Sequence, residues 1–177
     1  MTDTGHRPSA AVELGVGVPT GEPGLAVPTG EPGLGAPDHD PGLSLPADEP
    51  TVPVGAGELG ARLGIELISA EPGRVVGSMP VLGNTQPFGV LHGGASCVLA
   101  ESLASIGACL HFAADGGVGV GTEINASHHR PVSTGRVTGV ATAVRLGRTH
   151  ATYEIAVEDE QGRRVCSARM TCVRSRA

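Results

Sequence analysis

The chain has 177 residues, enough for one domain of ordinary size with a tail. Its formal net charge of −6 is unevenly distributed. Residues 1–53 hold eight acidic side chains and one arginine, whereas residues 54–177 hold ten acidic side chains and eleven arginines and are close to neutral. A nucleic-acid surface needs clustered basic residues, so the composition argues against nucleic acid as a partner.

The four cysteines include no C-x-x-C pair, and no basic and then apolar leader precedes them. These features predict free thiols in a reducing cytoplasm. The longest apolar run, residues 94–114, is interrupted by Glu101 and by several serines and glycines, which argues against a membrane span.

Residues 1–53 are predicted to be a disordered tail, because they hold ten of the 14 prolines, nine glycines and no aromatic side chain. The tail contains a nine-residue tandem duplication, GVPTGEPGL (17–25) followed by AVPTGEPGL (26–34). Two copies are too few for a solenoid. A duplicated linker is the favoured interpretation, and a proline-rich docking segment is the alternative.

Residues 54–177 are predicted to form one α+β domain. The elements expected in chain order are a short helix over 59–63, strands near 65–69 and 74–80, a loop over 83–93 and a helix over 95–110. The long helix lacks proline and is rich in Ala and Leu. It is apolar on nearly every face, which predicts a buried central helix with Glu101 as its only charged residue.

A period of two replaces the helical pattern after residue 117. It predicts a half-buried strand whose even-numbered residues face inward, namely Val118, Val120, Thr122, Ile124 and Ala126. Further strands are expected near 136–146, 149–159 and 165–173, with turns at 133–135, 147–148 and 160–162. The pattern favours an antiparallel sheet wrapped around the long helix.

Glu101 is the first residue that needs an explanation, because an isolated buried carboxylate must be paired, kept neutral or used. An ion pair with an arginine of a neighbouring strand is the structural alternative to a catalytic role. The loop before the helix ends in His92, Gly93 and Gly94. The first N–H groups of a helix lack internal partners and lie at the positive end of its dipole, so they can polarise a carbonyl.

The glycines at this helix start are also compatible with a purely steric role, and His92 and Gln86 with fixing the loop by hydrogen bonds. The spacing between Gly93 and Glu101 is more informative than the residue types themselves. Gly93 and Glu101 are eight residues apart, roughly 12 Å along a helix, so one carbonyl cannot touch both within a single chain. If both act on one substrate, they come from two chains of an obligate dimer. Ser105 lies one turn after Glu101 on the same face and can orient the carboxylate or a water.

Two other kinds of site lack support. His128 and His129 are adjacent on a predicted strand and should face opposite ways, and no H-E-x-x-H motif is present, so we expect no metal site. A serine nucleophile is not expected either, since the G-x-S-x-G elbow is absent. Phe88, Val98 and Phe112 are interpreted as core residues, with pocket walls as the alternative.

Three segments carry a resemblance to a known family: QPFGVLHGGASCVLAESLAS (86–105), GTEINASHHRPVSTGRVTGVA (121–141) and LGRTHATYEIAVEDEQGRR (146–164). They resemble hotdog-fold acyl-CoA thioesterases, and among these the phenylacetate-pathway branch with the dihydroxynaphthoyl-CoA, hydroxybenzoyl-CoA and siderophore-proofreading enzymes. The resemblance covers about residues 58–175. It implies the hotdog fold, dimers that pair into tetramers, and no cofactor besides the coenzyme A of the substrate.

The resemblance also implies residue roles. Glu101 would act as nucleophile or general base, and the Gly93 N–H would polarise the thioester carbonyl. Gln86 and His92 would line that side, and Ser105 would place water or substrate. Contacts to the acyl-CoA are expected from Gly94, Ser102, His128, His129, Arg130 and Arg148, the two arginines facing the CoA phosphates.

The function expected from the sequence is hydrolysis of an aromatic or hydroxyaromatic acyl-CoA to the free acid and CoA. One alternative keeps the chemistry and changes the carrier: a proofreading hydrolase of acyl groups attached to a carrier protein. The other is a non-catalytic module that binds acyl-CoA.

Overall fold

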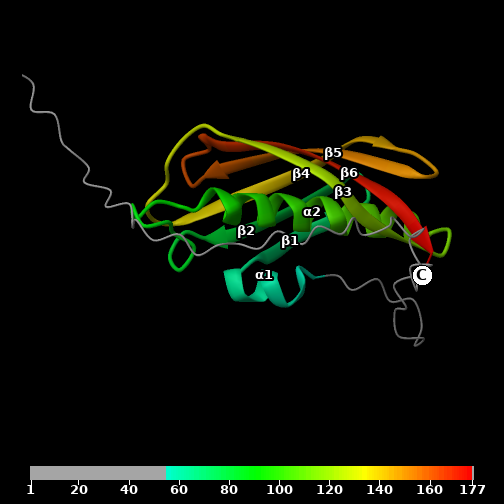
Figure 1. The fold of residues 1–177 in the computed structure, drawn as a ribbon, viewed down its shortest axis with the longest axis horizontal. Coiled ribbons are helices and arrows are strands. Elements are labelled where there is room, and N and C mark those ends of the chain that lie inside the picture. Colours follow the sequence, from blue (N-terminus) through cyan, green and yellow to red (C-terminus); the bar gives the residue numbers. More distant parts are fainter. Residues whose placement is uncertain (1–54, 177) are drawn as a thin grey trace, which may run out of the picture. The chain divides into compact units, whose positions relative to one another are not determined.

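The computed structural model describes residues 55–176. The predicted tail and its duplication, within residues 1–53, lie outside these residues. The elements in chain order are α1 (Gly57–Leu63), β1 (Glu66–Glu71), β2 (Arg74–Pro80), α2 (Gly93–Ala113), β3 (Gly117–His128), β4 (Arg136–Leu146), β5 (His150–Asp159) and β6 (Arg164–Arg176) (Figure 1).

The six strands form one antiparallel sheet in the order β1-β2-β4-β5-β6-β3, and α2 runs along its concave side (Figure 1). The predicted antiparallel sheet around one long helix is therefore confirmed. The bounds of β2 and β4 agree with the prediction, because turn-forming residues flank both strands.

Glycines in the central strands make room for the side chains of α2. A Cβ built on Gly139 of β4 would lie 2.7 Å from one methyl carbon of Leu103, and one built on Gly77 of β2 would lie 2.8 Å from the other. Leu103 and Leu99 are both fully buried. The helix thus lies close enough to the sheet for its leucines to fill the core without voids.

The predicted phase of β3 is wrong in its first half. Gly119, rather than Val118 or Val120, faces α2: a Cβ on Gly119 would lie 2.7 Å from the Ala108 Cβ. Val120 is 40% exposed. The register shifts between Gly121 and Glu123, and such a bulge inserts one extra residue and reverses the side-chain alternation. Beyond it Ile124 packs against the core as predicted.

The prediction that α2 is buried on nearly every face is also wrong. The sheet covers one side of the helix, and the opposite side is partly or fully exposed at Gly94, Cys97, Val98, Glu101, Ser102, Ser105 and Cys109. We call this stripe the open side of α2. By length and composition α2 is apolar enough to cross a membrane, but 56% of its most apolar stretch is buried within the domain.

Candidate functional site

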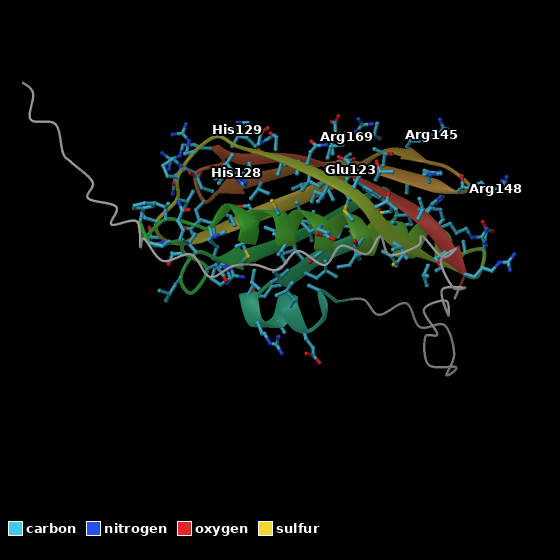
Figure 2. The ribbon with its side chains drawn as sticks, in the orientation of Figure 1. Glu123, His128, His129, Arg145, Arg148 and Arg169 are labelled. Carbon is cyan, nitrogen blue, oxygen red and sulfur yellow. The ribbon has the colours of Figure 1, made fainter. Side chains whose placement is uncertain are left out.

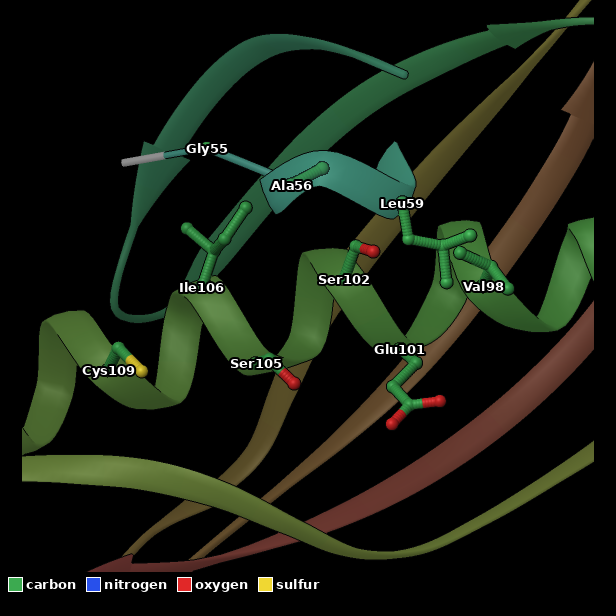
Figure 3. Close-up of a pocket in the computed structure, with 9 residues that line it drawn as sticks. All are labelled: Gly55, Ala56, Leu59, Val98, Glu101, Ser102, Ser105, Ile106 and Cys109. Carbon is green, nitrogen blue, oxygen red and sulfur yellow. The ribbon is translucent and has the colours of Figure 1, made fainter. Parts of the chain in front are cut away.

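Two pockets flank α2 in the described part of the chain. The first, which we call the Glu101 pocket, has a volume of about 420 Å³ and lies between the start of α1 and the open side of α2 (Figure 3). It is lined by Gly55, Ala56, Leu59, Val98, Glu101, Ser102, Ser105, Ile106 and Cys109. The pocket therefore combines one carboxylate and two hydroxyl groups with an apolar wall.

The second pocket, which we call the Gly93 pocket, has a volume of about 330 Å³ and lies at the N-terminus of α2. It is lined by Gln86, Val90, Leu91, Gly93, Ser96, His128, His129, Arg130, Pro131 and Val165. The predicted site residues are thus divided between the two pockets. The Glu101 pocket holds Glu101, Ser102 and Ser105, the Gly93 pocket holds Gln86, Gly93, His128, His129 and Arg130, and neither is lined by His92, Gly94 or Arg148.

Glu101 is exposed rather than buried, because it lies on the open side of α2. Its side chain leaves the helix in the same direction as that of Ser105 (Figure 3), and a Cβ built on Gly121 of β3 would lie 3.8 Å from its Oε1. No ion pair to Glu101 occurs within residues 55–176, so the structural alternative of a partner arginine is not realised there. The carboxylate remains available to a ligand.

The other members of the Glu101 pocket have distinct positions. Ser102 and Ile106 point towards α1, whereas Ser105 points with Glu101 (Figure 3). Leu59, which is 53% exposed, projects from α1 towards Val98. The sequence predicted the short helix but gave no sign that Leu59 would line a pocket, because that depends on how α1 packs across α2.

His92 caps the start of α2. Its Nδ1 accepts a hydrogen bond of 2.8 Å from the Gly94 N–H, and its carbonyl accepts from the Ala95 N–H. The Gly94 N–H is therefore occupied, whereas the Gly93 N–H has no hydrogen-bond partner among residues 55–176. This donor lies at the positive end of the helix dipole and borders a pocket, which suits it to a ligand oxygen.

His128 packs directly against the start of α2, since a Cβ on Gly93 would lie 2.9 Å from the His128 Nε2. Glycine at this position is what allows the contact. The His129 Nε2 instead lies 3.0 Å from the Ser167 Oγ, and Ser167 alternates on β6 with the buried Cys166 and Ala168. The two histidine rings therefore point in different directions, as predicted, although both residues border the Gly93 pocket. Residues 55–176 contain no cluster of three or more His, Cys, Asp or Glu arranged to hold a metal.

The two predicted phosphate contacts lie far apart within one chain. Arg130 lines the Gly93 pocket, whereas Arg148 sits in the turn between β4 and β5. That turn is attached to the last turn of α2, since the His111 Nε2 lies 2.9 Å from the Gly147 carbonyl oxygen. His111 follows Gly93 by roughly 27 Å along the helix. Figure 2 shows Arg148 towards the opposite end of the domain from His128 and His129.

Two thiols on or near α2 are poor nucleophiles. All four cysteines lie within the described residues and none forms a disulfide there. Burial, with smaller effects of Cys109 and Glu101, raises the pKa of Cys172 to about 11. Burial also raises the pKa of Cys97, and the negative charge of Glu101 adds to that rise. Because the thiolate is the reactive form, chemistry at Cys97 and Cys172 is disfavoured at neutral pH.

The three apolar residues interpreted as core residues lie in three different environments. Phe112 is buried in the core, as predicted, with 1% exposure. Val98 lines the Glu101 pocket. The prediction that Phe88 packs in the core is wrong: its side chain is 86% exposed, because it occupies the tip of the turn between Gln86 and Val90.

An antiparallel sheet curved around one long helix is the architecture of the hotdog class of proteins. Residues 88–166 match the family described as thioesterase superfamily, and the chain belongs to this family. It is therefore a hotdog-fold thioester hydrolase.

Named relatives and a solved structure agree with this family assignment. The chain is 48% identical over 116 residues to a protein of Deinococcus radiodurans named putative esterase, covering 66% of this chain and 73% of that one. It is 50% identical over 111 residues to the proofreading thioesterase EntH of Klebsiella pneumoniae, covering 62% and 80%. A crystal structure of a mutant of thioesterase PA1618 from Pseudomonas aeruginosa is 41% identical, with a TM-score of 0.63 over 67% of this chain and 86% of that one.

Proposed function

We propose that the protein hydrolyses acyl-CoA thioesters with an aromatic or hydroxyaromatic acyl group, in the cytoplasm and without a metal or redox cofactor. The observation that carries the proposal is the Glu101 carboxylate on the open side of α2 together with the Gly93 N–H at the start of the same helix, neither of which has a partner within residues 55–176. The Glu101 carboxylate can attack the thioester carbon or activate a water that does, and the Gly93 N–H can stabilise the oxyanion.

The two groups need two chains to reach one carbonyl. They belong to different pockets and lie roughly 12 Å apart along α2. A symmetric dimer satisfies both sites at once only if Gly93 of each helix faces Glu101 of the other, which requires the two helices to run antiparallel. The two pockets are then halves of one site.

The sheet offers an edge for this pairing. Among the described residues β3 is hydrogen-bonded to β6 alone, which leaves its other edge open along 12 residues. A long open edge favours pairing with another chain. Because α2 packs tightly on β3 at Gly119, joining two β3 strands antiparallel would also bring two α2 helices side by side.

In the proposed reaction the thioester carbonyl accepts a hydrogen bond from the Gly93 N–H of one subunit, which polarises the carbon. Glu101 of the other subunit attacks this carbon, or takes a proton from a water that attacks it. The C–S bond breaks and CoA leaves as the thiolate. In the direct-attack route the acyl group is then held by Glu101 as a mixed anhydride, and water breaks this bond to release the acid and restore the carboxylate. In either route one water is consumed: its hydroxyl ends in the acid and its proton reaches the thiolate.

The residues that line the two pockets support acyl-CoA as the substrate class. Leu59, Val98 and Ile106 give the Glu101 pocket an apolar wall suited to an acyl group. Arg130 borders the Gly93 pocket and can meet a CoA phosphate there. Arg148, at the far end of α2, can reach the same CoA only from another subunit, which fits the proposed dimer and its pairing into tetramers.

The test is thiol release from benzoyl-, hydroxybenzoyl-, phenylacetyl- and dihydroxynaphthoyl-CoA by wild type, Glu101→Gln and Glu71→Gln. Glu71, exposed at the end of β1, is the matched control for loss of one surface charge. Removing the reacting carboxylate should lower kcat by about 10³-fold, and the control should be unaffected. Retained activity in Glu101→Gln would remove this residue from the reaction.

The carrier-protein hydrolase is a second candidate, because the EntH relative is named a proofreading thioesterase. Comparing kcat/KM for one acyl group on CoA and on a carrier protein separates the two. A preference for the carrier-bound form would move the protein to the proofreading role with the same catalytic residues.

A further inference from the structure

Phe88 is an unusual surface residue in this chain. The protein has only three aromatic side chains of the Phe, Tyr and Trp types, and the other two, Phe112 and Tyr153, are 1% and 0% exposed. The ring of Phe88 is 86% exposed. Leaving a phenyl ring in water forgoes a large hydrophobic stabilisation that contact with another apolar group would restore.

Backbone hydrogen bonds hold the turn that carries Phe88 in one conformation. The Gln86 N–H donates to the Val90 carbonyl at 2.9 Å, and the Gly89 N–H donates to the Gln86 carbonyl at 2.9 Å. Gly89 has a φ of +73°, a conformation that glycine adopts without strain. Thr85 and Leu91 close the turn with an isolated bridge. The backbone therefore fixes the ring in its outward position.

The ring stands at the rim of the proposed site, because Gln86 and Val90 on either side of it both line the Gly93 pocket. In the antiparallel pairing, Gly93 of one chain faces Glu101 of the other. The turn that carries Phe88 precedes the N-terminus of α2, so in an antiparallel pair it lies on the side of the part of the partner's α2 that follows Glu101. That part carries Ile106, in the apolar wall of the Glu101 pocket.

The partner's Glu101 pocket can accept such a ring. In a single chain it is open to solvent on the side of Leu59, which is 53% exposed although it belongs to the pocket lining. Closing this side with an apolar group would bury Leu59 and Phe88 together. It would also remove water from the carbonyl, where exclusion of water strengthens the electrostatic interactions.

We propose that Phe88 of one subunit closes the apolar side of the partner's Glu101 pocket, contacts the acyl group and determines a preference for flat aromatic acyl groups. The inference rests on the proposed two-chain site. Aromatic pairs in offset or edge-to-face contact gain stability beyond their buried area, whereas a short alkyl chain gains only the area term.

The first test compares kcat/KM for benzoyl-CoA and butanoyl-CoA in wild type, Phe88→Ala and Leu82→Ala. Leu82 is 88% exposed in the same β2–α2 connection and lines neither pocket, so it controls for loss of an exposed apolar side chain. We expect the benzoyl-to-butanoyl ratio to fall about tenfold in Phe88→Ala and to stay within about twofold of wild type in Leu82→Ala. An unchanged ratio in Phe88→Ala would overturn the proposal.

The second test asks which subunit supplies the ring. Dimers assembled from one Glu101→Gln chain and one Phe88→Ala chain, isolated with two different affinity tags, should contain one site with both native residues. They should show the wild-type acyl ratio at about half the wild-type activity. If the ring instead served its own chain's pocket, the only active site would lack it, and the ratio would match that of the Phe88→Ala homodimer.

The reciprocal dimer is the control. A chain carrying both substitutions, paired with a wild-type chain, should leave one active site without the ring and show the altered ratio. A wild-type ratio there would overturn the assignment of Phe88 to the partner's site. Failure of the proposed function is a separate result: it would appear as an active Glu101→Gln homodimer, whatever the ratio in Phe88→Ala.

Discussion

The two sides of α2 differ more than their sequence suggests. The side facing the sheet carries Leu99 and Leu103, both fully buried above glycines of β2 and β4. The open side carries Glu101 and Ser105, which line a pocket. Adjacent residues on one helix thus belong to different environments, since each position is rotated about 100° from the last.

We expect this difference to separate substitutions that change stability from substitutions that change activity. On the sheet side, a substitution changes packing that holds the fold together. On the open side, a substitution of Glu101 or Ser105 changes a side-chain group that no other described residue pairs with, so the native state loses little. The comparison predicts that variants of the two sides will show opposite patterns of activity and stability.

The largest effect on stability is expected from Leu103→Ala. Removing this side chain leaves a cavity between α2 and the glycines of β2 and β4, which should lower the free energy of unfolding by about 3 kcal/mol. The kcat of the folded protein should not change. Urea unfolding at one fixed protein concentration measures the loss, with Leu82→Ala as the exposed control. A fall in kcat with unchanged stability would break the comparison between the two sides.

A smaller effect, on activity rather than on stability, is expected from Ser105→Ala. Its hydroxyl points with Glu101 into the pocket, so its removal should lower kcat by about tenfold through poorer placement of the carboxylate or water. The free energy of unfolding should stay within about 0.5 kcal/mol of wild type. Thiol-release kinetics and urea unfolding measure the two quantities, and Ser69→Ala, exposed on β1, is the control. Equal losses in both serine variants would remove Ser105 from the site.

The smallest effect concerns a residue away from both sides of α2. Burial acts to raise the pKa of Asp159, but hydrogen bonds from Arg163 and Gln161 outweigh it and lower that pKa. A lowered folded-state pKa means that the stabilisation is present above the unfolded-state value, near pH 4, and is lost as pH falls through the folded-state value. Asp159→Asn should therefore lower Tm by a few degrees at pH 7, and the difference should vanish in strong acid.

Thermal unfolding between pH 2 and 7 measures that prediction, and kcat at pH 7 should be unchanged. A Tm difference that persists at the lowest pH would show that Asp159 acts through its shape in the β5–β6 turn rather than through its charge.

Much of the fold was predictable because its signals are local. The alternation over residues 136–146 and the turn residues beside it are properties of neighbouring positions, and β4 has those bounds. The helix start was marked by His92 and the glycines after it, and α2 begins at Gly93. Glu101 could be singled out because a lone charge within an apolar helix is visible in the sequence alone.

The rest could not be predicted, because it depends on contacts between distant segments. An evenly apolar helix has no periodicity to show which side meets the sheet, so Glu101 was expected to be buried when it is exposed. The alternation in β3 concealed a bulge after Gly121, which reverses the side-chain phase. Phe88 was expected in the core because hydrophobicity predicts burial, yet the turn around Gly89 directs it outward.

By itself the sequence determined the kinds of elements, their order, and the two groups of the proposed site, Glu101 and the Gly93 N–H, since these follow from periodicity, turn residues and side-chain chemistry. Only the tertiary structure decided which residues from other elements line the pockets around those groups, and that Arg130 and Arg148 lie at opposite ends of α2. The physical reason is that a helix spaces its residues along an axis, while the sheet covers only one side of it.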